Sequence, residues 1–176
     1  MRPLAPALCA SLLLSACVAP SAPPPAPVAV QNPAPSPPPP APSLAADWRD
    51  WPVTPGDWSY RQDANGSLAS FGRPQTSPDF AIRCDRTSRR ITLSRAGDAG
   101  TAGRMRVRTS FADAAWPVQT AAGAAPYATV SLDAADPVLD RMAFSRGRFV
   151  IELSGQPYLA LPPWPEFIRV IEDCRG

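Results

Sequence analysis

Residues 80–94 have the sequence FAIRCDRTSRRITLS, and the spacing of their apolar residues determines the class of fold. From Phe80 to Cys84 a large apolar residue or a cysteine occupies every second position, and Ile91 and Leu93 repeat this spacing. Because successive side chains of a β-strand point to opposite faces, each run places its apolar residues on one face. The polar connection between the runs is short enough for a hairpin. We therefore predict two antiparallel strands that cover a common core.

The same alternation recurs on both sides of this hairpin. Further strands are predicted at residues 58–62, 67–71, 104–108, 127–132, 148–153 and 158–161. Asn65-Gly66 is expected to form the turn between the first two of these strands. Glycine and proline lie between most runs, as an antiparallel sheet or sandwich requires. The expected fold class is mainly β: a small antiparallel β-sandwich-like domain with two short helices, one of them C-terminal.

The two helices are predicted from their first residues and their apolar spacing. Asp136-Pro137 offers an N-cap followed by proline at the first helical position, and Gly147 is expected to close this helix. The second helix is expected to begin near Pro165 and to dock on the sheet. The apolar stripe of the second helix consists of Phe167, Val170, Ile171 and Cys174.

The N-terminus resembles a bacterial lipoprotein signal. Leu14-Ser15-Ala16-Cys17 closes a short apolar stretch and resembles the lipobox, in which the cysteine is acylated, in part with palmitate, and becomes the mature N-terminus. The apolar stretch is shorter than the roughly 20 residues of a membrane-spanning helix. An ordinary signal peptidase could instead cut after Ala19, but Pro20 would then follow the cut directly. The resemblance implies a signal peptide at residues 1–16 and lipidation at Cys17.

A proline-rich segment follows the lipobox. Residues 18–43 are almost entirely Pro, Ala, Ser and Val, which favours a semi-rigid polyproline II spacer of at most ~80 Å. Val18 stands where inner-membrane lipoproteins often carry aspartate, so the signal resembles that of an outer-membrane lipoprotein. We expect the lipidated cysteine and spacer at residues 17–46 and a β-rich domain at residues 47–176. The expected location is the outer membrane, with the anchored domain facing the periplasm.

The cysteines that remain in the mature domain are Cys84 and Cys174. Both are expected to face the core, and an exported pair of this kind favours a disulfide. Two buried reduced thiols are the alternative interpretation. A zinc site is disfavoured because the chain contains no histidine that could complete the ligand set.

Composition also restricts catalysis. The chain contains no histidine and no lysine, which removes Ser-His-Asp, Cys-His, Ser-Lys and Schiff-base chemistry. Paired carboxylates remain as a route to acid–base catalysis. The candidates are Glu152 with Glu166, or Asp133, Asp136 and Asp140. Glu152 is expected to be a solvated carboxylate on a strand and Asp136 a helix cap, so we expect no enzyme activity, no metal and no cofactor.

Arginines on one strand are the candidate ligand site. Arg104, Arg106 and Arg108 occupy alternate positions and must share one face. If Arg90 lies on a neighbouring strand, the four guanidinium groups form an anion-binding strip, since arginine binds phosphate and carboxylate bidentately. The expected partners are anionic lipid, lipopolysaccharide or peptidoglycan, and nucleic acid is not expected. The alternative is a solvated strand face compensated by nearby Asp residues, in keeping with a net charge of +2.

Three tryptophans cluster near the start of the domain. Trp48, Trp51 and Trp58 could form a carbohydrate-stacking platform, but such residues more often close one end of a small β core. The core interpretation is therefore favoured.

Three segments carry a wider resemblance: Cys84, SRGRF at residues 145–149, and LPPWPEFIRVIEDCR at residues 161–175. Together they resemble a group of uncharacterised alphaproteobacterial envelope proteins. The order of strand-borne cysteine, late strand and closing segment distantly resembles the invasion-associated locus B family. Neither resemblance supplies catalytic residues. The expected function is an outer-membrane lipoprotein with a non-catalytic periplasmic domain for binding or envelope support. The alternative is an envelope lipoprotein that inhibits a hydrolase, and its partner is then an envelope protein, the hydrolase.

Overall fold

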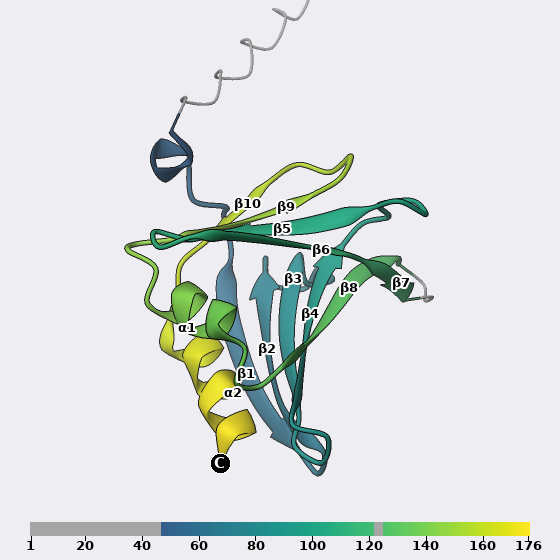
Figure 1. The fold of residues 1–176 in the computed structure, drawn as a ribbon, viewed down its shortest axis with the longest axis vertical. Helices are drawn as coiled ribbons and strands as arrows, with labels where there is room; N and C mark the ends of the chain where they lie inside the picture. Colours follow the sequence, from purple (N-terminus) through teal and green to yellow (C-terminus); the bar gives the residue numbers. More distant parts are fainter. Residues whose placement is uncertain (1–46, 122–124) are drawn as a thin grey trace, which may run out of the picture. The chain divides into compact units, whose positions relative to one another are not determined.

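The computed structural model describes residues 47–121 and 125–176. Over these residues the chain forms two antiparallel sheets (Figure 1). The six-stranded sheet consists, in spatial order, of β1 (Asp57–Asp63), β2 (Gly66–Gly72), β3 (Phe80–Asp85), β4 (Arg90–Ala96), β8 (Tyr127–Asp133) and β7 (Gln119–Ala121). The four-stranded sheet consists of β10 (Leu159–Leu161), β9 (Phe149–Leu153), β5 (Arg104–Arg108) and β6 (Asp113–Pro117). The helices are η1 (Trp48–Asp50), α1 (Pro137–Ala143) and α2 (Pro165–Arg175).

The mainly β, sandwich-like fold with a C-terminal helix is confirmed. In Figure 1 the four-stranded sheet lies across one end of the six-stranded sheet, and α2 runs along a face of the latter. β6 and β7 were not predicted. They are separated by Val118 alone, so the chain passes from one sheet into the other within a single extended segment. Because β6 is half-buried on both faces at its centre, it lacks the alternation that identifies a strand.

The β1–β2 hairpin is present, but its turn is shifted by one residue. Asp63 pairs with Gly66, so the two turn residues are Ala64 and Asn65. Gly66 is the first residue of β2, with φ of +152°, and a Cβ atom there would lie 2.2 Å from the carbonyl oxygen of Cys84. The glycine is therefore required by the close approach of β3 and not by the turn itself.

One core joins both sheets and both α-helices. The inward residues of β3 and β4 are fully buried, as the opening pattern predicted. Trp58 packs against Phe71, Phe80 and Phe167, and its indole Nε1 donates a hydrogen bond of 2.9 Å to the carbonyl oxygen of Pro162. The predicted stripe of α2 is buried along its whole length and packs on β1, β2 and β3. Burial of these aromatic rings provides much of the stabilisation of the fold.

α1 begins as predicted and ends earlier than predicted. Asp136 caps its N-terminus by accepting a hydrogen bond of 2.9 Å from the amide of Val138. The helix ends at Ala143, because the amide of Phe144 makes the final bond back to Asp140. Gly147 does not close the helix; it adopts φ of +77° in the loop that leads into β9.

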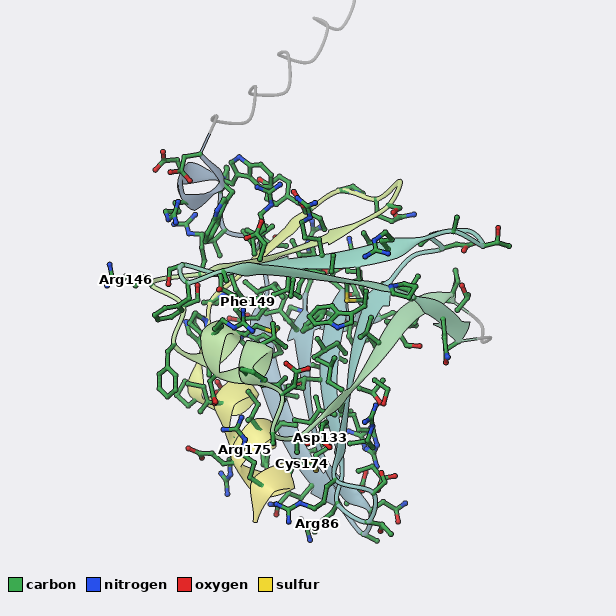
Figure 2. The ribbon with its side chains drawn as sticks, viewed as in Figure 1. Arg86, Asp133, Arg146, Phe149, Cys174 and Arg175 are labelled. Carbon is green, nitrogen blue, oxygen red and sulfur yellow. A yellow bond between two sulfur atoms is a disulfide. The ribbon has the colours of Figure 1, made fainter. Side chains whose placement is uncertain are left out.

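The sulfur atoms of Cys84 and Cys174 lie 2.22 Å apart, at disulfide distance, which is the predicted pairing. The pair joins β3 to α2 near the end of the helix, where Figure 2 labels Cys174. Among the described residues, both hydrophobic clusters and the Cys84–Cys174 pair lie between residues 48 and 174.

The signal peptide predicted at residues 1–16, the lipidated Cys17 and the spacer predicted at residues 17–46 lie outside the described residues. Within residues 47–121 and 125–176, no helix has both the length and the apolar character needed to cross a membrane.

Candidate functional site

The three arginines of β5 share one face, as predicted. Met105 and Val107 are fully buried, so Arg104, Arg106 and Arg108 project from the opposite, outer face of the four-stranded sheet. Arg104 and Arg106 are exposed, and Arg108 is half-buried. We call Arg104, Arg106 and Arg108 the arginine strip.

The prediction that Arg90 joins this strip is wrong. Arg90 lies on β4, whose neighbours are β3 and β8, whereas β5 lies between β6 and β9 in the other sheet. The guanidinium group of Arg90 instead donates to Ser131 on β8, at 3.2 Å to the hydroxyl and 2.9 Å to the carbonyl oxygen. The strip therefore contains three arginines.

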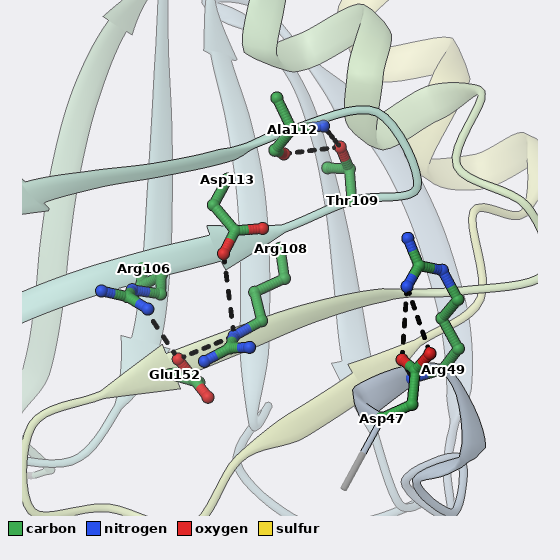
Figure 3. Close-up of polar contacts among 8 residues, drawn as sticks. All are labelled: Asp47, Arg49, Arg106, Arg108, Thr109, Ala112, Asp113 and Glu152. Atoms are coloured by element: carbon green, nitrogen blue, oxygen red, sulfur yellow. Dashed lines mark hydrogen bonds and ion pairs between the residues drawn. The ribbon is translucent and has the colours of Figure 1, made fainter.

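Two carboxylates lie beside the strip (Figure 3). Glu152 is opposite Arg106 on β9, and its Oε2 lies 3.2 Å from Nε of Arg108 and 3.9 Å from Nε of Arg106. Asp113 Oδ2 lies 4.0 Å from Nε of Arg108. Glu152 is partly exposed on the outer face of its strand, as expected, and in addition it lies against two arginines. The compensation by Asp residues considered from the sequence is present as Asp113 beside Arg108, but the nearer carboxylate is Glu152, and compensation is weak at Arg106.

Arg104 has a different environment. Its Nη2 donates to the carbonyl oxygen of Ala115 at 3.2 Å, and no carboxylate among the described residues lies within ion-pair distance of it. A shallow hollow of about 320 Å³ adjoins Arg104 and Arg106. The hollow is lined by Arg104, Arg106, Ala115, Glu152, Leu153 and Ser154. A small anionic group can enter it and receive hydrogen bonds from two arginines.

The tryptophan cluster is divided by the four-stranded sheet. Trp58 lies in the main core, whereas Trp48 and Trp51 pack on the outer face with Val150 and Ala160. The core interpretation therefore holds for Trp58 in the main core and for Trp48, which is buried in a second, small cluster, while Trp51 packs against that cluster and is only half-buried. The ring of Trp51 lies 5.9 Å from the guanidinium carbon of Arg108, so aromatic side chains border one end of the arginine strip.

Of the other candidate carboxylates, Asp133 and Asp140 have structural partners, whereas one oxygen of Glu166 has none. Asp133 accepts a hydrogen bond of 2.9 Å from the amide of Ala135, and Asp140 lies 2.7 Å from Arg175 Nη1. Glu166 lies in the first turn of α2, and its Oε2 is buried without a hydrogen-bond partner. In the described part of the chain no group of three or more cysteine or acidic residues is placed to hold a metal ion.

Arg95 is a buried charge that the sequence did not single out. It lies on the inward face of β4 and is 6% exposed, and burial lowers the pKa of its guanidinium group. Its Nη atoms donate to the carbonyl oxygens of Ala96 at 2.5 Å, Asp79 at 3.4 Å and Pro157 at 3.3 Å. These bonds connect β4 to the β9–β10 turn, so Arg95 is a structural residue.

Comparisons of the chain with protein-family models, with curated proteins and with solved structures returned no match.

Proposed function

We propose that the chain is an outer-membrane lipoprotein, anchored through Cys17, whose domain at residues 47–176 is a non-catalytic binding module facing the periplasm. The lipobox-like sequence and the proline-rich segment after it support the anchor and the spacer. A spacer of this composition gives a folded domain the reach to contact an envelope ligand at a distance from its anchor.

Side-chain chemistry supports a non-catalytic role. The chain has no histidine or lysine, and most of its candidate acids have structural partners: Glu152 lies against arginines, Asp136 caps α1, and Asp140 pairs with Arg175. Glu166, whose Oε2 has no hydrogen-bond partner, is the exception.

The ligand proposed for the module is an anionic envelope component that binds at the arginine strip. The observation that carries this proposal is the hollow lined by Arg104 and Arg106, where Glu152 is the single acid of the lining. Guanidinium groups recognise phosphate and carboxylate by paired hydrogen bonds. Lipopolysaccharide and anionic lipid present phosphate, and peptidoglycan stem peptides present carboxylate.

Binding of the domain at residues 47–176 to lipopolysaccharide, to phosphatidylglycerol vesicles and to soluble peptidoglycan fragments tests this proposal. We expect binding to at least one of them at low salt, weakened as salt screens the charges. The triple change Arg104→Ser, Arg106→Ser and Arg108→Ser should weaken binding by at least about tenfold, since a hydrogen bond to a charged group contributes roughly 1.5–3 kcal/mol.

Arg90→Ser is the matched control, because it removes an exposed arginine from the other sheet. It should leave ligand affinity unchanged. No binding of any of the three ligands at low salt, or equal binding by the triple variant, would contradict the proposal.

A further inference from the structure

Two exposed phenylalanines lie together at one edge of the domain. Phe111 is 57% exposed and Phe144 is 67% exposed, which makes them the most exposed large apolar residues over the described ranges. Phe111 comes from the β5–β6 loop and Phe144 from the residue after α1. Both line one shallow hollow of about 190 Å³, together with Asp140 and Arg141.

The loop that carries Phe111 is held in one conformation. The hydroxyl oxygen of Thr109 accepts hydrogen bonds from the amides of Phe111 at 3.2 Å and of Ala112 at 3.1 Å. The same hydroxyl donates to the carbonyl oxygen of Ala112 at 2.8 Å (Figure 3). Thr109 is 3% exposed, so water does not compete for these bonds. The exposed phenylalanine therefore projects from an ordered turn.

The two loops are also joined to each other. The amide of Ser110 donates to the hydroxyl of Ser145 at 3.0 Å, and the amide of Arg146 donates to the hydroxyl of Ser110 at 3.0 Å. Ser145 is buried, and its hydroxyl donates to the carbonyl oxygen of Arg148 at 2.5 Å. This reciprocal bonding keeps Phe111 and Phe144 together before any partner arrives, which lowers the entropy cost of binding.

Unpaired positive charge borders the phenylalanines. Arg141 donates to the carbonyl oxygen of Pro137 at 3.3 Å, and in Figure 2 Arg146 extends away from the body of the domain. Neither arginine has a carboxylate within ion-pair distance in the part of the chain that the structure covers. Asp140, the acid of the hollow, is paired with Arg175 at 2.7 Å.

We propose that Phe111, Phe144, Arg141 and Arg146, here called the aromatic edge, dock the domain on an anionic lipid bilayer. The phenylalanine rings enter the apolar layer, and the guanidinium groups contact the lipid phosphates above it. This arrangement matches the order of chemistry across a bilayer surface, with negative charge outside and hydrocarbon beneath. The aromatic edge is distinct from the arginine strip and needs no lipid at Cys17.

The small size of the apolar surface favours a bilayer over a protein partner. A stable protein interface buries about 800 Å² on each side, with an apolar centre surrounded by polar residues. The apolar lining of this hollow is two phenylalanine rings. Two rings suffice for reversible attachment to a bilayer when basic side chains assist them.

The test uses the domain at residues 47–176, which carries no lipid, and vesicles of equal parts phosphatidylglycerol and phosphatidylethanolamine. We expect the wild-type domain to co-sediment with these vesicles and less with phosphatidylcholine vesicles. The change Phe111→Ser with Phe144→Ser should weaken binding by about tenfold for each ring, the effect expected from withdrawing one exposed phenylalanine from the apolar layer.

Trp164→Ser with Val53→Ser is the matched control, because it removes two exposed apolar side chains from other segments. It should leave vesicle binding unchanged. The triple change in the arginine strip separates the two sites: it should weaken ligand binding at the strip by at least about tenfold while the phenylalanine-dependent part of vesicle binding remains. If the triple variant of the arginine strip binds as the wild-type domain does, the proposed function is contradicted and the proposal for the aromatic edge is not.

A second measurement does not depend on comparing affinities. In Phe111→Trp or Phe144→Trp, vesicles with brominated acyl chains should quench more tryptophan fluorescence than in the wild-type domain. Equal vesicle binding by the double serine variant, or no additional quenching in both tryptophan variants, would overturn the proposal. Either result would favour a protein as the partner of these two phenylalanine rings.

Discussion

Glu152 on β9 lies with its Oε2 atom 3.2 Å from Nε of Arg108, and this ion pair holds a negative charge against the arginine strip. The same oxygen lies 3.9 Å from Nε of Arg106. One carboxylate thus orients two guanidinium groups and partly neutralises them. Arg104, which has no such partner among the described residues, is the arginine most available to an anionic ligand.

Removing the charge of Glu152 should strengthen anion binding. Glu152→Gln keeps the shape of the side chain and removes the charge that opposes the ligand. We expect a gain of a few-fold in affinity for the ligand identified at the strip, since partly exposed ion pairs contribute up to about 1 kcal/mol. Isothermal titration at low salt measures the change. Glu172→Gln, at an exposed acid of α2, is the control, and unchanged affinity in Glu152→Gln would place the ligand elsewhere.

The cysteine pair should stabilise the domain strongly. Cys84 and Cys174 are 90 residues apart in the sequence, and closing a loop of this size contributes about 4–5 kcal/mol in the chain-entropy model. Changing both to alanine should lower the melting temperature markedly. Peptide mapping without reductant should recover the linked peptides. Two thiols that react with an alkylating agent in unreduced, unfolded protein would contradict the pairing.

Cys17 should be the site of lipidation. Globomycin, which blocks the lipoprotein signal peptidase, should cause the unprocessed precursor to accumulate in a producing bacterium. Cys17→Ser should remove the lipid and release the chain from the membrane fraction or leave its signal uncut. Normal processing in the presence of globomycin, with the mature form in the periplasmic fluid, would instead indicate cleavage after Ala19.

Asp63 and Arg83 form an ion pair that should be visible in a pH titration. Arg83 donates to both carboxylate oxygens, at 2.8 and 3.1 Å, and with the amide of Asn65 it lowers the pKa of Asp63 to about 2. A lowered pKa in the folded state stabilises the fold above the unfolded value of about 3.9. This contribution should be lost as the pH falls towards about 2.

Carboxyl-carbon NMR can follow this titration directly. In Arg83→Gln the pKa of Asp63 should rise towards its ordinary value, because the pair with the guanidinium group is the largest cause of the shift. Arg61→Gln, at an exposed arginine of β1, should leave it unchanged. An unchanged Asp63 titration in Arg83→Gln would show that the backbone bonds alone lower the pKa.

Local periodicity was sufficient to predict most of the strands and the buried face of each. Alternation identified β3, β4 and β5, and helical spacing identified the buried stripe of α2. These patterns are reliable because a residue's face depends only on the conformation of its own segment. The inward positions of Cys84 and Cys174 followed from two such segments, and their pairing followed from both facing one core.

Contacts between segments distant in the sequence were decided by the tertiary structure. The separation of Arg90 from the arginine strip, the pairing of Glu152 with Arg108 and the division of the tryptophans depend on which strands are neighbours. The joining of the loops that carry Phe111 and Phe144 depends on two serine hydroxyls 35 residues apart in the chain, Ser110 and Ser145. The sequence by itself determined the face on which each side chain lies, because that follows from local backbone geometry. Only the packed sheets decided which faces meet, because strand order depends on the burial of the whole core.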